Sequence, residues 1–257
     1  MRQDGVVLPV KNSCVVELRG KLSSSSTDIT NSCSGIVIDA TRGLVVTTAS
    51  VFHPFLEGKH RNVLKRTLSL DHRWFRHVHV NVTVEADHGN KHKDILKHDD
   101  DSNLVDGDSI DRRTEQYEGE ILHMCKVPSF ATQLSRLFSS SDGWRITDKN
   151  LTNTKETPHD DSLQILASFV LIKLKTWRER RQNLAVSRHL DVGDTLYAVA
   201  TPFGAMSLAV FMNSVSKGVV SNVAESLLVT DARSVPGCEG GALYTGTYPH
   251  RSVNHSK

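Results

Sequence analysis

The chain has 257 residues, of which 38% are hydrophobic, and its 31 basic and 29 acidic side chains leave a formal net charge of +2. This balance gives no electrostatic argument for nucleic-acid binding. No segment approaches the roughly 20 consecutive apolar residues of a membrane-spanning helix, and the first residues lack the plan of a secretory signal. A two-lobed unit or two small domains are the expected organisation.

Valines occupy every second position of residues 78–84, with polar residues between them. This period of two is typical of a strand with one apolar face. Earlier in the chain, residues 35–39 and 44–48 are short β-like runs joined by a polar turn, which predicts a hairpin. The first part of the chain is therefore expected to be rich in strands.

Two polar stretches, at about 86–116 and 129–161, are predicted as insertions, because loops of this length are uncommon inside a compact domain. A strand-like run at 118–127 separates them. From 162 to 245 the β pattern returns, with turn signals between the runs. Many short strands and little helix signal predict an all-β barrel or sandwich.

The first polar stretch raises the question of a metal site. His88 and His92 have the i, i+4 spacing that chelates a metal on a helix, and His98 and Asp99–Asp101 follow them. The stretch has no helical periodicity, so a hydrated loop is the preferred interpretation. The four cysteines are far apart, without a Cys-x-x-Cys pair, and are expected to be free thiols.

Residues 227–243 carry the most informative motif, Leu-Leu-Val-Thr-Asp-Ala-Arg-Ser-Val-Pro-Gly-Cys-Glu-Gly-Gly-Ala-Leu. The motif resembles the nucleophile loop of trypsin-like proteases, most closely the Deg/HtrA branch, where Thr-Asp-Ala precedes Gly-x-Ser-Gly-Gly-x-Leu. In that loop the glycines allow a sharp turn that directs N–H groups at an oxyanion. The corresponding oxyanion-loop region here would be Gly237, Cys238, Glu239, Gly240 and Gly241.

Further blocks lie in the order that this resemblance requires. Residues 190–204 resemble the first strand of the second barrel with its Pro-Phe-Gly turn, and 214–221 resemble the strand that follows. Residues 34–50 resemble the Ser-Gly strand and the Thr-Ala-His strand of the first barrel. The resemblance implies an all-β, trypsin-like double β-barrel, with a first barrel at 5–176 and a truncated second barrel at 188–257.

The resemblance also implies a degenerate catalytic triad. Serine protease chemistry needs a hydroxyl nucleophile, an imidazole base and a carboxylate that orients the base. The histidine position falls on Ser50, the aspartate position on Ser168 and the nucleophile position on Glu239. No residue is therefore a confident catalytic one, and the chain alone is expected to be inactive. A carboxylate at Glu239 can instead occupy the oxyanion hole.

The candidates to replace the missing groups are weak. Cys238 is one residue early for a nucleophile, so its thiol should point elsewhere. His53 lies three residues after the histidine position and would face differently, and Asp160 and Asp161 lie in a polar loop. The basic cluster at 178–181 has no interleaved aromatic residues, so a solvated surface is preferred over nucleic-acid binding.

A Glu-Gly-Gly that follows Thr-Asp-Ala-Arg and Pro-Gly resembles the N-terminal half of the peroxisomal leader peptide-processing protease family. In that family the C-terminal half carries the working triad of a serine endopeptidase. The resemblance implies that this segment supports the catalytic half, oligomerisation or substrate binding. It implies no cofactor and no metal, and as partners protein or peptide substrates, the catalytic half or further copies, but neither nucleic acid nor membrane.

The same resemblance implies a location in the peroxisomal matrix, although the sequence itself carries no targeting signal. Few residues follow Leu243, so a fragment or a short isoform with an open second barrel is expected. One alternative is a free-standing pseudoprotease that acts as a peptide-binding scaffold. The other is a hydrolase that uses Cys238, which is the least favoured.

Overall fold

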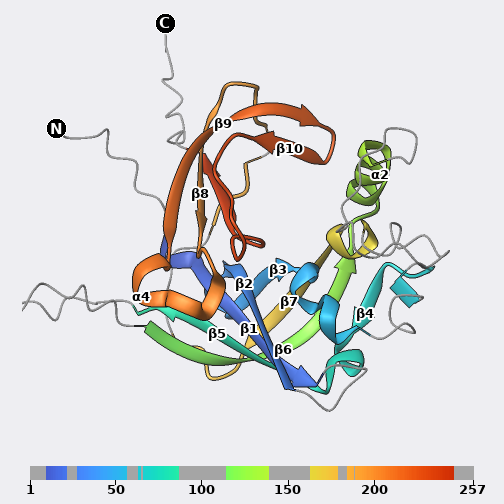
Figure 1. Cartoon of the computed structure of the whole chain (residues 1–257), viewed down its shortest axis with the longest axis vertical. Helices are drawn as coiled ribbons and strands as arrows, with labels where there is room; N and C mark the ends of the chain where they lie inside the picture. Colours follow the sequence, from blue (N-terminus) through green and yellow to red (C-terminus); the bar gives the residue numbers. More distant parts are fainter. Residues whose placement is uncertain are drawn as a thin grey trace, which may run out of the picture.

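The structure is a computed structural model. It describes residues 10–21, 28–56, 63–64, 66–86, 114–138, 163–178, 184–187 and 189–245. These residues form two antiparallel sheets that lie one above the other in Figure 1, with the earlier strands in the lower sheet and the later strands in the upper sheet. We call the lower unit the first lobe and the upper unit the second lobe.

Six strands of the first lobe close into a barrel, because β7 pairs with both β3 and β6. Around the barrel the order is β6-β5-β1-β2-β3-β7, and β4 adds to the outer edge of β6. The strands are β1 (Ser13–Lys21), β2 (Asp28–Asp39), β3 (Leu44–Thr48), β4 (Ser69–Asp71), β5 (Val78–Glu85), β6 (Thr114–Lys126) and β7 (Ser168–Leu174).

The predicted hairpin of the first lobe is present as β2 and β3, with Ile36 opposite Val46. Its turn is held by the Asp39 carboxylate, whose Oδ1 accepts hydrogen bonds from the N–H groups of Thr41 at 3.0 Å and Arg42 at 2.9 Å. Hydrogen bonds from Thr41 and Arg42 lower the pKa of Asp39. The turn is therefore specified by its own sequence, as expected for an Asp at the first position of a turn.

The valines of β5 point into the barrel, as the alternating pattern predicted, and Val80, Val82 and Val84 are buried. One end of the barrel is covered by the 3-10 helix η2 (Ala49–Phe55). Its Phe52 packs edge to face against Phe75, with ring centroids 5.6 Å apart. Phe75 belongs to the short helix η3 (His72–Phe75), and a further short helix, η1 (Val10–Asn12), precedes β1.

Helix α2 (Pro128–Leu137) occupies the beginning of the stretch 129–161, which was predicted as a polar insertion. Its Ala131 and Leu134 are buried against Leu163 and Ala167, so one narrow apolar face anchors it. Serines and threonines around that face hide the helical period in the sequence. The strand that precedes α2 also begins earlier than predicted, within the stretch 86–116.

The second lobe is a four-stranded sheet in the order β10-β9-β8-β11. Its strands are β8 (Thr195–Ala200), β9 (Ser214–Ala224), β10 (Leu227–Thr230) and β11 (Ala242–Thr245), with η6 (Gly204–Ser207) and α4 (Leu208–Phe211) between β8 and β9. Within the described residues β10 and β11 are its edges. A closed barrel followed by a second antiparallel sheet confirms the predicted all-β, trypsin-like class.

Candidate functional site in the cleft between the lobes

Strand β2 holds the loops of the second lobe in place through direct hydrogen bonds. The N–H and the hydroxyl of Ser34 both donate to the carbonyl oxygen of Gly237, at 2.9 and 2.7 Å. The same hydroxyl accepts from the N–H of Thr201 at 2.8 Å, and the Ser32 hydroxyl accepts from the N–H of Ala205 at 2.9 Å. The loop that carries the candidate site is therefore fixed against the first lobe.

Two contacts farther from β2 add to this interface. The side-chain amide of Asn213 donates to the Glu85 carboxylate at 2.6 Å. The side-chain amide of Gln133, on α2, donates to the carboxylate of Glu225 at 2.5 Å, in the turn between β9 and β10. The second lobe is thus tied to the first at three separate places.

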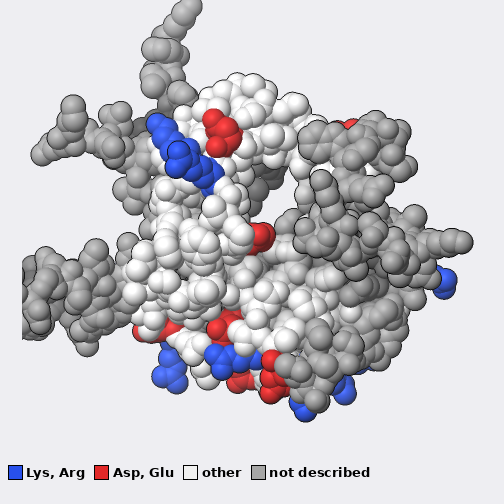
Figure 2. All heavy atoms as spheres, viewed as in Figure 1, with Lys and Arg blue, Asp and Glu red and all other residues white. Residues whose placement is uncertain are grey.

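A cleft of about 730 Å³ lies between the lobes. Ser50 and Cys33 line it from the first lobe, and Phe203, Gly237 and Glu239 line it from the second. No histidine, lysine or arginine is among the described residues that line this cleft. In the space-filling view, acidic atoms lie at the hollow between the lobes, while other acidic atoms lie beside basic atoms on the upper lobe and along the lower rim (Figure 2).

The Glu239 carboxylate accepts a hydrogen bond from the N–H of Gly237, two residues earlier, at 2.7 Å. Gly237 has φ +94°, and a Cβ there would lie only 2.4 Å from the backbone nitrogen of Gly204. A glycine is needed at this position for both reasons. The loop therefore turns sharply, and a carboxylate of the same loop engages the N–H group that the turn presents.

Ser50 lies at the start of η2 and is half-buried. Its hydroxyl is 3.1 Å from the hydroxyl of Thr48, which caps the helix by accepting the Ser50 N–H. A histidine accepts and passes on a proton through its two basic ring nitrogens. A serine hydroxyl is much less basic and has no such pair of nitrogens. Ser50 therefore lies at the cleft without a general base's chemistry.

Ser168 is fully buried at the start of β7, and its hydroxyl donates to the carbonyl oxygen of Gln164 at 2.7 Å. It is not among the residues that line the cleft. The structure thus brings Ser50 and Glu239 to one cleft, whereas Ser168 is buried and does not line it.

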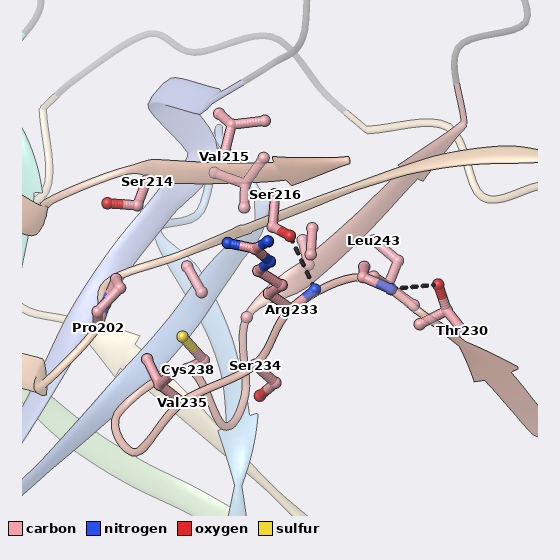
Figure 3. Close-up of a pocket in the computed structure, with 16 residues that line it drawn as sticks. Pro202, Ser214, Val215, Ser216, Thr230, Arg233, Ser234, Val235, Cys238 and Leu243 are labelled. Atoms are coloured by element: carbon pink, nitrogen blue, oxygen red, sulfur yellow. Dashed lines mark hydrogen bonds between the residues drawn. The ribbon is translucent and has the colours of Figure 1, made fainter. Parts of the chain in front are cut away.

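Two cysteines lie near the candidate site, Cys238 in the loop itself and Cys33 on β2. Cys238 lines a different pocket, inside the second lobe (Figure 3). Its neighbour Glu239 lines the cleft. Cys33 does line the cleft but is buried, and its thiol is 3.0 Å from the Thr47 hydroxyl. Burial, together with a smaller effect of the negative charge of Glu239, raises the pKa of Cys33 to about 12. Cys33 is therefore a protonated thiol and a poor nucleophile at neutral pH.

Sequence reasoning missed Cys33 as a cleft residue, because only the register of β2 against β1 and β3 decides which side chains meet the second lobe. His53 lies on η2 but does not line the cleft. In the described part of the chain no group of three or more metal-ligating side chains is found. His88, His92, His98, Asp99–Asp101, Asp160 and Asp161 lie outside the described residues, as does most of the cluster at 178–181.

No helix in the described segments combines the length and the apolar character needed to cross a membrane. No protein-family profile matches the sequence.

Curated proteins do resemble the chain. The peroxisomal leader peptide-processing protease of Mus musculus is 27% identical over 238 residues, and that of Homo sapiens is 29% identical over 236 residues. Each alignment covers 83% of this protein and 42% of the relative, so the chain spans less than half the length of the curated relatives it matches. The resemblance predicted from the motifs is confirmed: the chain is related in sequence to the peroxisomal leader peptide-processing proteases.

Proposed function

We propose that this chain is a non-catalytic, trypsin-like module of a peroxisomal processing protease, and that it binds peptide segments instead of hydrolysing them. The observation that carries the proposal is the hydrogen bond from the Gly237 N–H to the Glu239 carboxylate. A negative charge held at this donor leaves it unable to stabilise a developing oxyanion, which is usually the largest single contribution to acyl transfer.

The other two positions support the same proposal. Ser50 offers a hydroxyl where a base is needed, and the Ser168 hydroxyl already donates to a backbone carbonyl. A peptidase of this class needs all three roles filled, because loss of one group alone lowers the rate by orders of magnitude. We infer that evolution of this module has kept the fold and the cleft while the proton-transfer chemistry was lost.

Peptide binding is the role that the remaining surface favours. The cleft, of about 730 Å³, is lined by the polar side chains of Thr30 and Asn31 together with the apolar Phe203 and Met206. The described edges of the second sheet, β10 and β11, offer backbone groups for a further strand. We propose that the bound segments are leader peptides of peroxisomal proteins, in line with the relatives' name, and that the protein works in the peroxisome.

The proposal is tested with the purified protein in a casein assay and by fluorophosphonate labelling read by mass spectrometry. We expect neither hydrolysis nor a labelled serine. The human relative, run in parallel, controls for the competence of the assay. Labelling of Ser50, Ser168 or Ser234 that rises together with hydrolysis would overturn the non-catalytic assignment.

The location is tested separately, by imaging the fluorescently tagged protein together with a peroxisomal matrix marker, expressed alone and with the remaining portion of a full-length relative. Co-localisation in the second case is expected. Exclusion from peroxisomes in both cases would contradict a role in matrix-protein processing.

A further inference from the structure

A second pocket, of about 330 Å³, lies inside the second lobe, separate from the cleft. It is enclosed by β8, β9 and β11 and by the loop at 232–238 (Figure 3). Its walls are largely small or apolar. Three of its side chains, Val215, Val235 and Leu243, are nevertheless 49%, 42% and 46% exposed. An apolar lining that stays this accessible is typical of a binding surface.

Arg233 is the single charged residue among the described residues that line this pocket. In Figure 3 its side chain extends across the pocket, with Ser216 on the β9 side and Cys238 on the loop side. The Arg233 backbone is fixed, because its N–H donates to the Ser216 hydroxyl at 2.8 Å. No carboxylate of the described residues pairs with its guanidinium.

The loop at 233–239 separates charges of opposite sign. Arg233 lines the pocket of the second lobe, whereas Glu239 lines the cleft and is held there by the Gly237 N–H. The carboxylate of this loop thus lines the cleft and not the pocket of Arg233, and Asp231, just before the loop, accepts a hydrogen bond from the N–H of Val219 at 2.7 Å. An arginine whose guanidinium has no carboxylate partner among the described residues, in a pocket with few other polar groups, suits a ligand that brings its own negative charge.

We propose that this pocket binds a carboxylate of a peptide, from an acidic side chain or from the terminal carboxyl group, with Arg233 as the anchoring cation. A guanidinium presents parallel N–H donors that match the two oxygens of a carboxylate, and the apolar walls accommodate the aliphatic part of the same residue. The inference deepens the proposed peptide-binding role and rests on it.

Three acetylated peptides of otherwise identical sequence distinguish the sources of the carboxylate by isothermal titration calorimetry. The first is Ala-Val-Ala-Glu-Ala amide, the second is the same peptide with Gln in place of Glu, and the third is the Gln peptide with a free terminal carboxyl group. We expect one of the two carboxylate peptides to bind about tenfold more tightly than the neutral one. The peptide that does so identifies the source.

Arg233→Gln is expected to abolish this preference, and Arg233→Lys to retain a part of it, since an ammonium keeps the charge without the paired donors. Lys217→Gln is the matched control, because it removes a positive charge from β9 at a residue that does not line the pocket. The control should keep the full preference.

The outcomes separate the two proposals. Equal affinity for all three peptides, or a preference that survives in Arg233→Gln, overturns the carboxylate site and leaves peptide binding standing. If none of the three peptides binds and a casein digest does not bind in the same calorimeter either, both the carboxylate site and the proposed peptide binding are overturned. If Arg233→Gln does not fold, a full preference in Arg233→Lys contradicts paired recognition.

Discussion

Ser34 donates two hydrogen bonds to one acceptor, the carbonyl oxygen of Gly237, and so joins the first barrel to the loop that carries Glu239. The same hydroxyl accepts from the N–H of Thr201, which is fully buried. One small side chain thereby positions both loops of the second lobe that reach the cleft. The second-lobe groups that meet Ser34 are backbone groups, so the geometry at this place leaves little freedom.

Replacement of Ser34 with alanine should lower the free energy of unfolding by about 1–3 kcal/mol, because the buried Thr201 N–H loses its acceptor. Urea denaturation followed by circular dichroism measures the change. Ser221→Ala, on an exposed position of β9, serves as the control and should change stability by less than about 0.5 kcal/mol. Equal losses of stability in the two variants would contradict the proposed contribution of the Ser34 hydroxyl to the free energy of unfolding.

Gly237 and Gly193 form a matched pair, since their φ angles are +94° and +95°. An added Cβ would meet nothing within 4 Å at Gly193 but would meet two backbone nitrogens of the Phe203–Gly204 turn at Gly237. Gly193→Ala should therefore cost about 1–2 kcal/mol, for the backbone conformation alone. Gly237→Ala should cost clearly more, by urea denaturation, and comparable losses would argue against the close approach of the loops.

Stability should decline at alkaline pH. The pKa of Cys33 is raised from its ordinary 9.0 to about 12, mainly by burial, and the pKa of Tyr244 is raised from 10.0 to about 12, again mainly by burial. Above pH 9 the unfolded protein loses protons that the folded protein retains. The stabilisation is therefore complete below pH 9 and is lost as pH rises towards 12, by up to about 1.4 kcal/mol per unit for each group.

The measurement is the free energy of unfolding at a series of pH values between 8 and about 10.5. Cys33→Ala should flatten the decline that begins at pH 9, whereas Cys125→Ala, at an exposed thiol, should leave it unchanged. A decline of the same slope in both variants would show that Cys33 does not titrate in this way.

Glu239→Ser restores a hydroxyl at the nucleophile position but supplies no base, because no histidine lines the cleft among the described residues. We expect this variant to remain unlabelled by a fluorophosphonate and inactive on casein. Ser50→His/Glu239→Ser adds an imidazole at the cleft and should give slow labelling of the new serine, detectable by mass spectrometry. Rapid labelling of Glu239→Ser alone would mean that another group already acts as a base.

Much of the fold could be predicted from the sequence itself. The alternating valines of β5 and the turn at Asp39 are local signals, and each corresponds to an observed element. Helix α2 was missed because only two buried side chains, Ala131 and Leu134, mark its inner face. Its stability comes from contacts with Leu163 and Ala167, which lie some thirty residues further along the chain.

The candidate site, like the fold, could be predicted from the sequence only in part. The loop motif placed Glu239 next to an N–H donor, and the observed hydrogen bond from Gly237 has that form. The motif contained nothing to indicate that Cys33 lines the same cleft, or that Arg233 and Glu239 face different pockets. Both facts depend on the tertiary packing of two strands and a loop from distant parts of the sequence. No short-range sequence pattern encodes this packing.

The approach of the two turns at Gly204 and Gly237 restricts how the lobes can move. A Cβ on Gly204 would lie 2.2 Å from the Ser32 hydroxyl, and one on Gly237 would lie 2.4 Å from the Gly204 nitrogen. The Ser32 side chain and the backbones of Gly204 and Gly237 are thus packed in succession, with room for no further side chain between them. Hinge bending between the lobes would have to break the packing of Ser32 on Gly204 and the hydrogen bonds of Ser34 to Gly237 together, so the width of the cleft is expected to change little when a peptide enters it.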